Sequence, residues 1–190
     1  TQRVCTENDM ASFRYLTGNG KDGEVNEAPG DIVYRIPAGS QIVVNHHYLN
    51  YNDVTMDGQS VVNINFAEND GRTYIPSGAV AFVNSTLDIP RGVSDLKISC
   101  VMEQEMKFWY LIPHMHRWGT NIKVDHTRGA QKTRLFDTNW QPELTFHPPE
   151  LRKDPSAPLV FAVGDQVDVH CTWNNDTPNN LNFGFEMCVS

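Results

Sequence analysis

The sequence lacks the features of a membrane protein and of a nucleic-acid-binding protein. No apolar run approaches the ~18 residues that a membrane helix requires. The formal net charge is −8, whereas nucleic acid and anionic membrane surfaces select clustered Lys and Arg. We therefore expect no membrane span and no nucleic-acid partner. The chain also begins without methionine or a signal-peptide pattern, which indicates a processed or trimmed product.

Several common catalytic motifs are absent as well. The sequence has no GxSxG elbow, no P-loop and no glycine-rich dinucleotide fingerprint. It has four cysteines at wide spacing and no CxxC pair: Cys5, Cys100, Cys171 and Cys188. This pattern favours two disulfides in an oxidising compartment over a structural zinc site. Two N-x-S/T sequons, at Asn84 and Asn175, agree with secretion, so we expect an extracellular or periplasmic protein.

Helical periodicity is almost absent, and strand patterns recur along the 190 residues. Segments with β-branched or aromatic residues and partial alternation lie at 31–39, 41–49, 60–67, 79–87, 95–102, 106–116, 120–126 and 166–173. The hydrophobic fraction of 39% is sufficient for a core. We predict an all-β protein whose main part, residues 71–190, is an antiparallel jelly-roll β-sandwich.

A smaller β element is expected over residues 1–70, before a polar, turn-rich stretch at 68–78. This first part offers only about four strands, and so small a sheet rarely buries a core alone. It therefore either packs on the second part or is completed by strands from elsewhere, such as an upstream segment or a partner chain.

The stretch "LIPHMHRWG" places two histidines, His114 and His116, one residue apart in an apolar segment. Residues i and i+2 of a strand point to the same face, so the two imidazoles can form a metal clamp. Hydrogen-bonded or surface histidines are the structural alternative. In "NFGFEMCVS", Phe183, Phe185 and Met187 alternate on one face, with Glu186 and Cys188 on the other.

A thioether from Met187 beside two imidazoles suits copper that cycles between Cu(I) and Cu(II), although a buried methionine is usually core packing. Cys188 is next to Met187 and could bond to Cys171 in "VHCTW".

A third histidine cluster lies in "VVNHHYLN". Strand alternation puts His46 and His47 on opposite faces, so one of them at most can serve a given site unless a bulge intervenes. One packed and one solvated histidine is the alternative. We expect His126, His147 and His170 to be structural or exposed.

The order "PHMHRWG", "VHCTWNN" and "EMC" resembles the copper type II, ascorbate-dependent monooxygenases, a family that includes peptidylglycine α-hydroxylating monooxygenase and dopamine β-monooxygenase. The resemblance implies that His114, His116 and Met187 bind the catalytic copper, where oxygen is activated and a substrate is hydroxylated. It also implies a Cys171–Cys188 disulfide. "DLKISC" resembles the opening of the family's second domain.

The first part resembles the end of the family's first domain. "IVVNHHYLN" matches a strand that gives one of three histidines to an electron-transferring copper, with His47 in the ligand place because Tyr48 follows it. The family's other two ligands for that copper form a His-His pair upstream of the matching region. The resemblance implies ascorbate or another small reductant as electron donor.

Two further departures qualify the resemblance. Peptide-amidating members carry an Arg two residues before the HxH motif, where this chain has Ile112, so a glycine-extended peptide is not the expected substrate. Family members also continue beyond the position of Ser190, which removes the usual partner of Cys100 and leaves Cys5 as its replacement.

Three functions follow as expectations. The first is a copper-dependent monooxygenase that uses O2 to hydroxylate a C–H bond of a small-molecule substrate. The second is a copper-binding module without turnover, such as a carrier or a partner subunit, because monooxygenation needs two electrons and one copper stores one. The third is an extracellular β-sandwich without a metal that keeps the fold for recognition.

Overall fold

The structure is a computed structural model that describes residues 3, 13–18, 23, 25–46 and 53–190. The chain divides into two compact units. Unit 1 comprises Thr1–Leu16 and Gly30–Ala79, and unit 2 comprises Thr17–Pro29 and Val80–Ser190. The described residues form strands and a short 3-10 turn, η1 (Pro142–Thr145), but no α-helix. The predicted all-β class is confirmed, and no described helix is long and apolar enough to cross a membrane.

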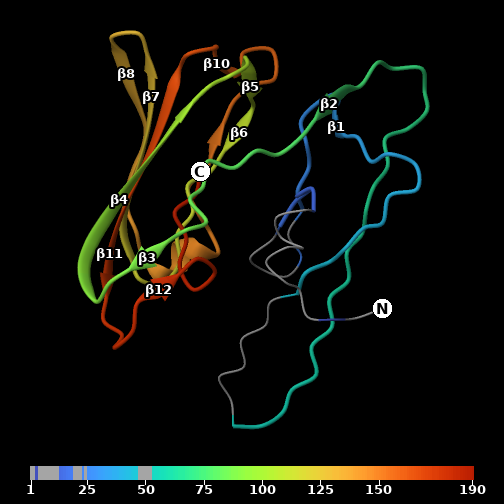
Figure 1. The fold of residues 1–190 in the computed structure, drawn as a ribbon. Helices are drawn as coiled ribbons and strands as arrows, with labels where there is room; N and C mark the ends of the chain where they lie inside the picture. Colours follow the sequence, from blue (N-terminus) through green and yellow to red (C-terminus); the bar gives the residue numbers. More distant parts are fainter. Residues whose placement is uncertain (1–2, 4–12, 19–22, 24, 47–52) are drawn as a thin grey trace. The chain divides into compact units, whose positions relative to one another are not determined.

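Unit 2 contains a four-stranded antiparallel sheet in the order β4-β11-β7-β8 (Figure 1). Its strands are the longest described ones: β4 (Gly92–Val101), β7 (Gly119–Arg128), β8 (Gln131–Asn139) and β11 (Gln166–Asn175). β11 is central and pairs along its whole length with β4. This position explains why six of its ten residues are buried.

Shorter strand pairs form the second layer of unit 2. The pairs are β3 (Asp88–Ile89) with β12 (Leu181–Asn182), β5 (Met106–Phe108) with β10 (Leu159–Phe161), and β6 (Tyr110–Leu111) with β9 (Leu151–Arg152). The C-terminal segment adds to this layer, because Val189 bridges both Val83 and His114. The two layers make an antiparallel β-sandwich, and the jelly-roll order of its strands stays a prediction.

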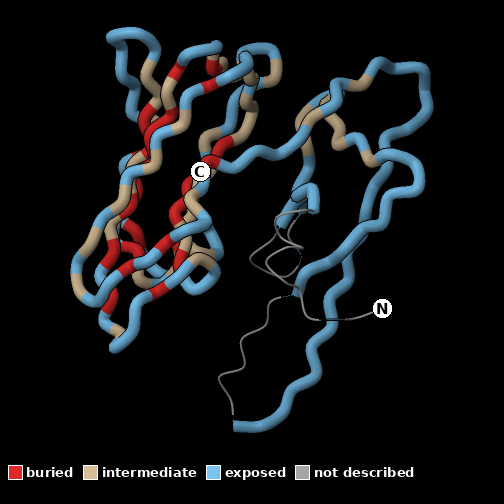
Figure 2. The backbone as a smooth tube through the Cα atoms, in the orientation of Figure 1, coloured by how far each residue is buried: buried red, intermediate tan, exposed pale blue. Residues whose placement is uncertain are grey.

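One hydrophobic core lies between these layers. The main sheet supplies fully buried side chains such as Ile122, Val169 and Trp173. The second layer and its loops supply Phe161 and Met115, both with 0% of their surface exposed. Figure 2 shows these buried positions concentrated along the facing strands. Burying side chains of this size contributes roughly 1.5–3 kcal/mol each, which is what holds the layers together.

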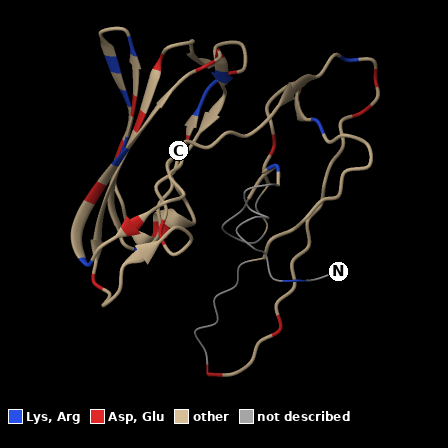
Figure 3. Ribbon diagram, in the orientation of Figure 1, with Lys and Arg blue, Asp and Glu red and all other residues tan. Residues whose placement is uncertain are grey.

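The strands of the main sheet carry charged residues of both signs (Figure 3). Buried Asp168 accepts a hydrogen bond from the Ser99 hydroxyl at 2.6 Å and pairs with Lys97 at 2.9 Å. Asp125 pairs with Lys132 at 2.8 Å and also with Arg134. These pairs cross from strand to strand, so they favour one register of the sheet.

Unit 1 has a different character. Its described ladder is a parallel pair of short strands, β1 (Ile32–Tyr34) with β2 (Ile75–Ser77). Every described residue of this unit is exposed or half-buried, in contrast to unit 2 (Figure 2). The expectation that the first part buries little core by itself therefore agrees with the structure. Whether an upstream segment or a partner chain completes it stays a prediction.

Several predicted strands are wrong. The described parts of 41–49, and all of 60–67 and 79–87, contain no strand apart from a single bridge at Val83. Alternating apolar residues favour an extended chain, but a strand also needs a neighbouring ladder. The strand predicted over 106–116 ends at Leu111, because Pro113 has no N–H for a ladder. The boundary predicted at residues 70 and 71 stays a prediction as a division between family-type domains.

The carboxylate of Asp165 joins the far end of β7 to the loop that precedes β11. It accepts hydrogen bonds from His126 Nε2 at 2.6 Å, Arg128 Nη2 at 2.7 Å and the Ala162 N–H at 2.8 Å. The hydrogen bond from Arg128, and then that from His126, lower the pKa of Asp165 although burial acts to raise it. The ionised carboxylate is therefore part of the folded state.

We predict that acid weakens the fold partly through Asp165. Because its folded pKa lies below the unfolded value of 3.8, its contribution is complete above that value and is lost as the pH falls below it. Asp165→Asn should lower the free energy of unfolding at pH 7 and flatten its decrease between about pH 4 and pH 2.5. Urea unfolding at several pH values measures both effects. The exposed Asp57→Asn is the control, and equal slopes in all three proteins would contradict the prediction.

Candidate metal centre

The loop with His114 and His116 runs from the end of β6 to the start of β7. It is anchored by an antiparallel bridge in which the His114 N–H donates to the Val189 carbonyl at 2.8 Å and the Val189 N–H donates back at 3.1 Å. Between the two histidines, Met115 is fully buried and packs against Gly119. A Cβ at Gly119 would lie only 2.9 Å from Met115 Cε, so the absence of a side chain there lets the loop close onto the core.

The two predicted imidazoles do come together. The ring centroids of His114 and His116 are 5.1 Å apart and the rings are perpendicular. His114 also lies edge-on to Trp140, with the ring centroids 6.4 Å apart. Both histidines are half-buried. This pair has the i, i+2 arrangement expected of a clamp, although it lies in a loop rather than on a strand.

A backbone carbonyl determines the tautomer of His116. Nδ1 of His116 lies 3.1 Å from the carbonyl oxygen of Phe185. A carbonyl oxygen can only accept, so Nδ1 must carry the proton and donate it. The lone pair of the neutral ring then lies on Nε2. Metal-binding histidines in proteins typically have this second contact, which fixes the ring and leaves the other nitrogen for the metal.

Burial and the neighbouring ring keep His114 neutral. Removal from water is the larger cause and the positive charge of protonated His116 the smaller one, and together they lower the pKa of His114 to about 4. The ring is therefore uncharged at neutral pH, which is the form that can donate a lone pair to a metal.

The carboxylate of Glu186 anchors the backbone of this loop. Its Oε2 accepts the Trp118 N–H at 3.0 Å, and its Oε1 accepts the N–H groups of His116 and of Met187, the latter at 2.9 Å. The side chain is fully buried. A buried carboxylate is costly unless donors surround it, and here three backbone amides provide them. Glu186 therefore ties the histidine loop to the segment that carries Met187.

A shared carboxylate oxygen brings the backbone of Met187 close to that of His116. Val189 pairs with His114 in an isolated bridge, and the N–H groups of His116 and Met187 both donate to Glu186 Oε1. Met187 is half-buried, whereas Glu186 and Cys188 on either side are fully buried. The predicted alternation of these three residues is confirmed. It does not extend to Phe185, which is 71% exposed because a turn at Gly184, with φ of 101°, interrupts the segment.

The predicted disulfide between Cys171 and Cys188 is confirmed, with Cα atoms 5.9 Å apart. Cys171 lies on the central strand β11, so the bond attaches the Met187 segment to the most buried strand of the sandwich. Cys100 forms no disulfide among the described residues. Its predicted partner Cys5 lies outside them, and the Cys5–Cys100 bond stays a prediction.

The other histidines of unit 2 do not join this centre. His47 and Tyr48 lie outside the described residues, so the second copper site stays a prediction, and His46 is exposed. His126 and His170 contact the carboxylates of Asp165 and Asp95, at 2.6 and 3.0 Å. His147 is exposed.

Within the described part of the chain, no three His, Cys, Asp or Glu side chains form a metal-binding group. A metal at His114 and His116 would therefore need a ligand of another kind, and Met187 is the predicted ligand whose backbone shares Glu186 Oε1 with His116. Comparison of the chain with models of protein families and with curated proteins finds no match.

Two groups that hold the centre could not be assigned from the sequence. Glu186 is visible as a carboxylate inside "EMC", but its spacing does not reveal that it accepts hydrogen bonds from an amide seventy residues earlier. The Phe185 carbonyl carries no sequence information at all. The available indication for Glu186 was its position between the apolar Phe185 and Met187, close to Cys188, which is typical of a buried segment.

We predict that Glu186→Gln loosens the histidine loop. Glutamine keeps one acceptor oxygen, but its NH2 group would face an amide N–H that also donates. Leaving buried donors without acceptors costs about 1–3 kcal/mol, so the free energy of unfolding should fall by that amount. Urea unfolding measures it, and exposed Glu143→Gln should change it by less than about 0.5 kcal/mol. Equal stability of both variants would contradict the assigned role of Glu186.

Proposed function

We propose that this chain is a copper protein related to the ascorbate-dependent monooxygenases, and that it hydroxylates a C–H bond of a small molecule with O2. His114, His116 and Met187 would hold the copper. The single observation that carries the proposal is the perpendicular pair of imidazoles, 5.1 Å apart, beside the backbone segment of Met187. The family-like "EMC" order and the Cys171–Cys188 bond support the same assignment.

The donor set fits copper better than other common metals. Two imidazoles and a thioether form a soft, mixed site, whereas magnesium and calcium need oxygen ligands and zinc sites rarely include thioethers. The proton on His116 Nδ1 leaves Nε2 as the donor atom toward the metal. Copper held there would supply one-electron redox chemistry for C–H hydroxylation, with ascorbate or another small reductant as the source of electrons.

The protein's own contribution is to position the ligands. Glu186 fixes the backbone of both His116 and Met187, the Phe185 carbonyl orients the His116 ring, and the disulfide holds the Met187 segment on β11. Ligands held rigidly by such supporting contacts keep a site in one geometry through a redox cycle. Half-burial of the pair leaves one side of the centre accessible to substrate and O2.

The alternative function is a copper-binding module without turnover. It is favoured if no second copper is bound, since hydroxylation consumes two electrons per turnover and one copper stores one. His47 is the residue that distinguishes the two functions, because the family resemblance assigns it to the electron-transferring copper. A secreted location and a small-molecule substrate belong to the proposal as well.

We predict that His114→Ala removes one copper per chain. The change deletes one of two imidazoles that share the metal, and the remaining donors bind weakly. Elemental analysis after copper loading and desalting measures the stoichiometry, with exposed His147→Ala as the matched control. An unchanged ratio in His114→Ala would show that this centre does not bind copper.

The same measurement on His47→Ala separates the two proposed functions. A loss of one copper in His47→Ala supports the enzyme, and a copper content that does not depend on His47 supports the carrier or partner subunit.

We predict that Met187→Ile weakens Cu(I) binding selectively. The substitution keeps most of the side-chain volume and removes the sulfur, which favours Cu(I) over Cu(II). Competition with a Cu(I) chelator should show at least about tenfold lower affinity, which corresponds to about 1.4 kcal/mol. Met106→Ile, at another half-buried methionine, serves as the control. Equal Cu(I) affinity in wild type and Met187→Ile would exclude the thioether as a ligand.

A further inference from the structure

A second feature lies at the other end of β7, about 30 Å along the strand from the histidine loop. Toward the core, β7 presents Ile122 and Val124, then His126 and Arg128. The change from apolar to polar residues on one inward-facing row needs an explanation, because polar groups facing a core are costly unless they have partners.

The neighbouring strand β8 shows the same change. Thr133 lies opposite His126, and Gln131 lies opposite Arg128. Farther along β8, Phe136 is buried opposite Val124. The apolar core thus ends between the layers, and a polar wall made by one β-hairpin continues beyond it.

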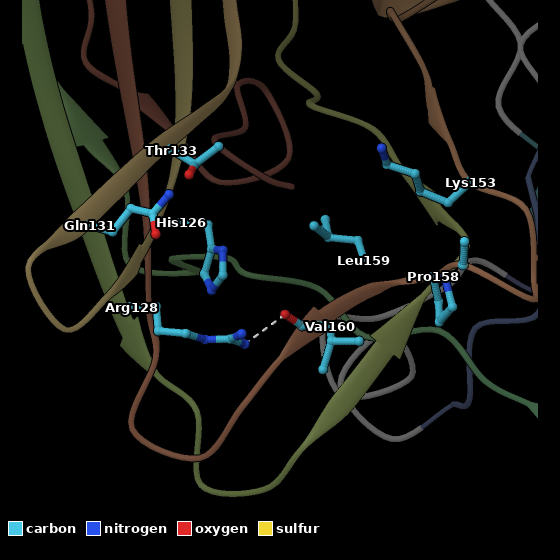
Figure 4. Close-up of a pocket in the computed structure, with 9 residues that line it drawn as sticks. His126, Arg128, Gln131, Thr133, Lys153, Pro158, Leu159 and Val160 are labelled. Atoms are coloured by element: carbon cyan, nitrogen blue, oxygen red, sulfur yellow. Dashed lines mark hydrogen bonds between the residues drawn. The ribbon is translucent and has the colours of Figure 1, made fainter.

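This wall lines a cavity of about 360 Å³. Residues from the segment Lys153 to Val160 form its opposite side, so the hairpin and this segment face each other across the space (Figure 4). The lower rim is closed by a hydrogen bond from Arg128 Nη2 to the Val160 carbonyl, at 2.9 Å. A cavity of this volume is large enough for a small ligand, and its lining offers both polar groups and an apolar side.

The lining carries positive charge. Arg128 is largely neutralised by Asp165, which also fixes His126 through its Nε2 atom. Lys153 has no such partner: the other described lysines each pair with a carboxylate, namely Lys97, Lys107, Lys123 and Lys132, whereas Lys153 makes no ion pair with a described residue. Its side chain extends toward the hairpin in Figure 4. No carboxylate belongs to the lining itself.

The opposite side is apolar where Leu159 and Pro158 meet the cavity. His126 adds a flat surface, because its ring stacks on Phe161 with the centroids 4.4 Å apart and the planes at 24°. An inorganic anion would satisfy Lys153 and leave these surfaces in contact with water. A ligand with both an anionic head and a small apolar body would use both parts of the cavity.

We propose that this cavity is a binding site for a small organic carboxylate. The carboxylate pairs with Lys153 and accepts a hydrogen bond from the Thr133 hydroxyl, while the apolar body packs against Leu159 and the His126 ring. Asp165 accepts hydrogen bonds from His126 and Arg128, which holds both side chains in place, and the charge of Arg128 balances its own. The site is independent of copper, because none of its lining residues belongs to the histidine centre.

Benzoate tests the proposal, with benzamide as the uncharged probe of the same shape. NMR titration at constant ionic strength should show that benzoate shifts the His126 ring and Thr133 amide resonances, and that benzamide binds at least about tenfold more weakly. Lys153→Gln should lower benzoate affinity about tenfold. Lys153 is exposed, and thermal unfolding checks that the variant folds.

Lys123→Gln is the matched control. Lys123 lies on β7, the strand that carries His126, but on the opposite face, where it pairs with Asp137 at 4.0 Å. Benzoate affinity should therefore stay within about twofold of wild type in this variant. The proposal is overturned if benzoate does not bind, if benzamide binds equally well, or if the two lysine variants weaken binding to the same extent. Resonance shifts confined to residues outside the cavity would also overturn it.

Discussion

The buried carboxylate of Glu186 is the interaction on which the candidate metal centre depends. Its two oxygens accept three backbone N–H groups, two from the histidine loop and one from Met187. Without the carboxylate, these donors would be buried without acceptors, and the loop would lose a link to the C-terminal segment that adds to the His114–Val189 bridge. The Phe185 carbonyl, next to Glu186 in the chain, lies at His116 Nδ1, so residues 185–187 contact both the backbone of the loop and one imidazole. A carboxylate that is fully engaged by amides is also unavailable as a metal ligand, which leaves the imidazoles and the thioether as donors.

The disulfide and the central strand make this arrangement rigid. Cys171 lies in the middle of β11, between β4 and β7, and Cys188 follows Met187 directly. A bond of sequence separation 17 restricts the unfolded chain by an amount worth about 3 kcal/mol. The bond also keeps the C-terminal segment attached to β11 of the main sheet. The Met187 segment is thus attached to the central strand β11, and the two histidines lie in a loop fixed by the fully buried Met115.

Much of this could be predicted from sequence where local pattern and tertiary environment agree. The strands β4, β7 and β11 alternate or run apolar, and the proximity of His114 to His116 follows from i, i+2 spacing. Prediction failed where local pattern and tertiary environment disagree. β8 forms a hairpin with β7 but is rich in polar residues, because it is an edge strand whose charges pair across to β7. The segment 60–67 has strand-like residues without a described ladder. The strand predicted over 106–116 ends before Pro113, which has no backbone N–H to donate to a neighbouring strand. The contacts of Glu186 with His116 and of Asp165 with His126 and Arg128 join residues that are tens of positions apart in the sequence, so no short motif predicts them.

The two ends of β7 show how one strand can serve two chemically different regions. At Gly119 the strand begins beside the paired rings of His114 and His116, where backbone amides occupy the Glu186 carboxylate. At Arg128 it ends in a region where charge is retained, with Asp165 compensating Arg128 and Lys153 left without a carboxylate. Ile122 and Val124 separate the two with a dry, apolar stretch. A rigid strand of this kind fixes the distance between the regions, and this distance of about 30 Å, together with screening by salt, weakens the Coulomb interaction between them. Each region can therefore change its residues without reorganising the sandwich.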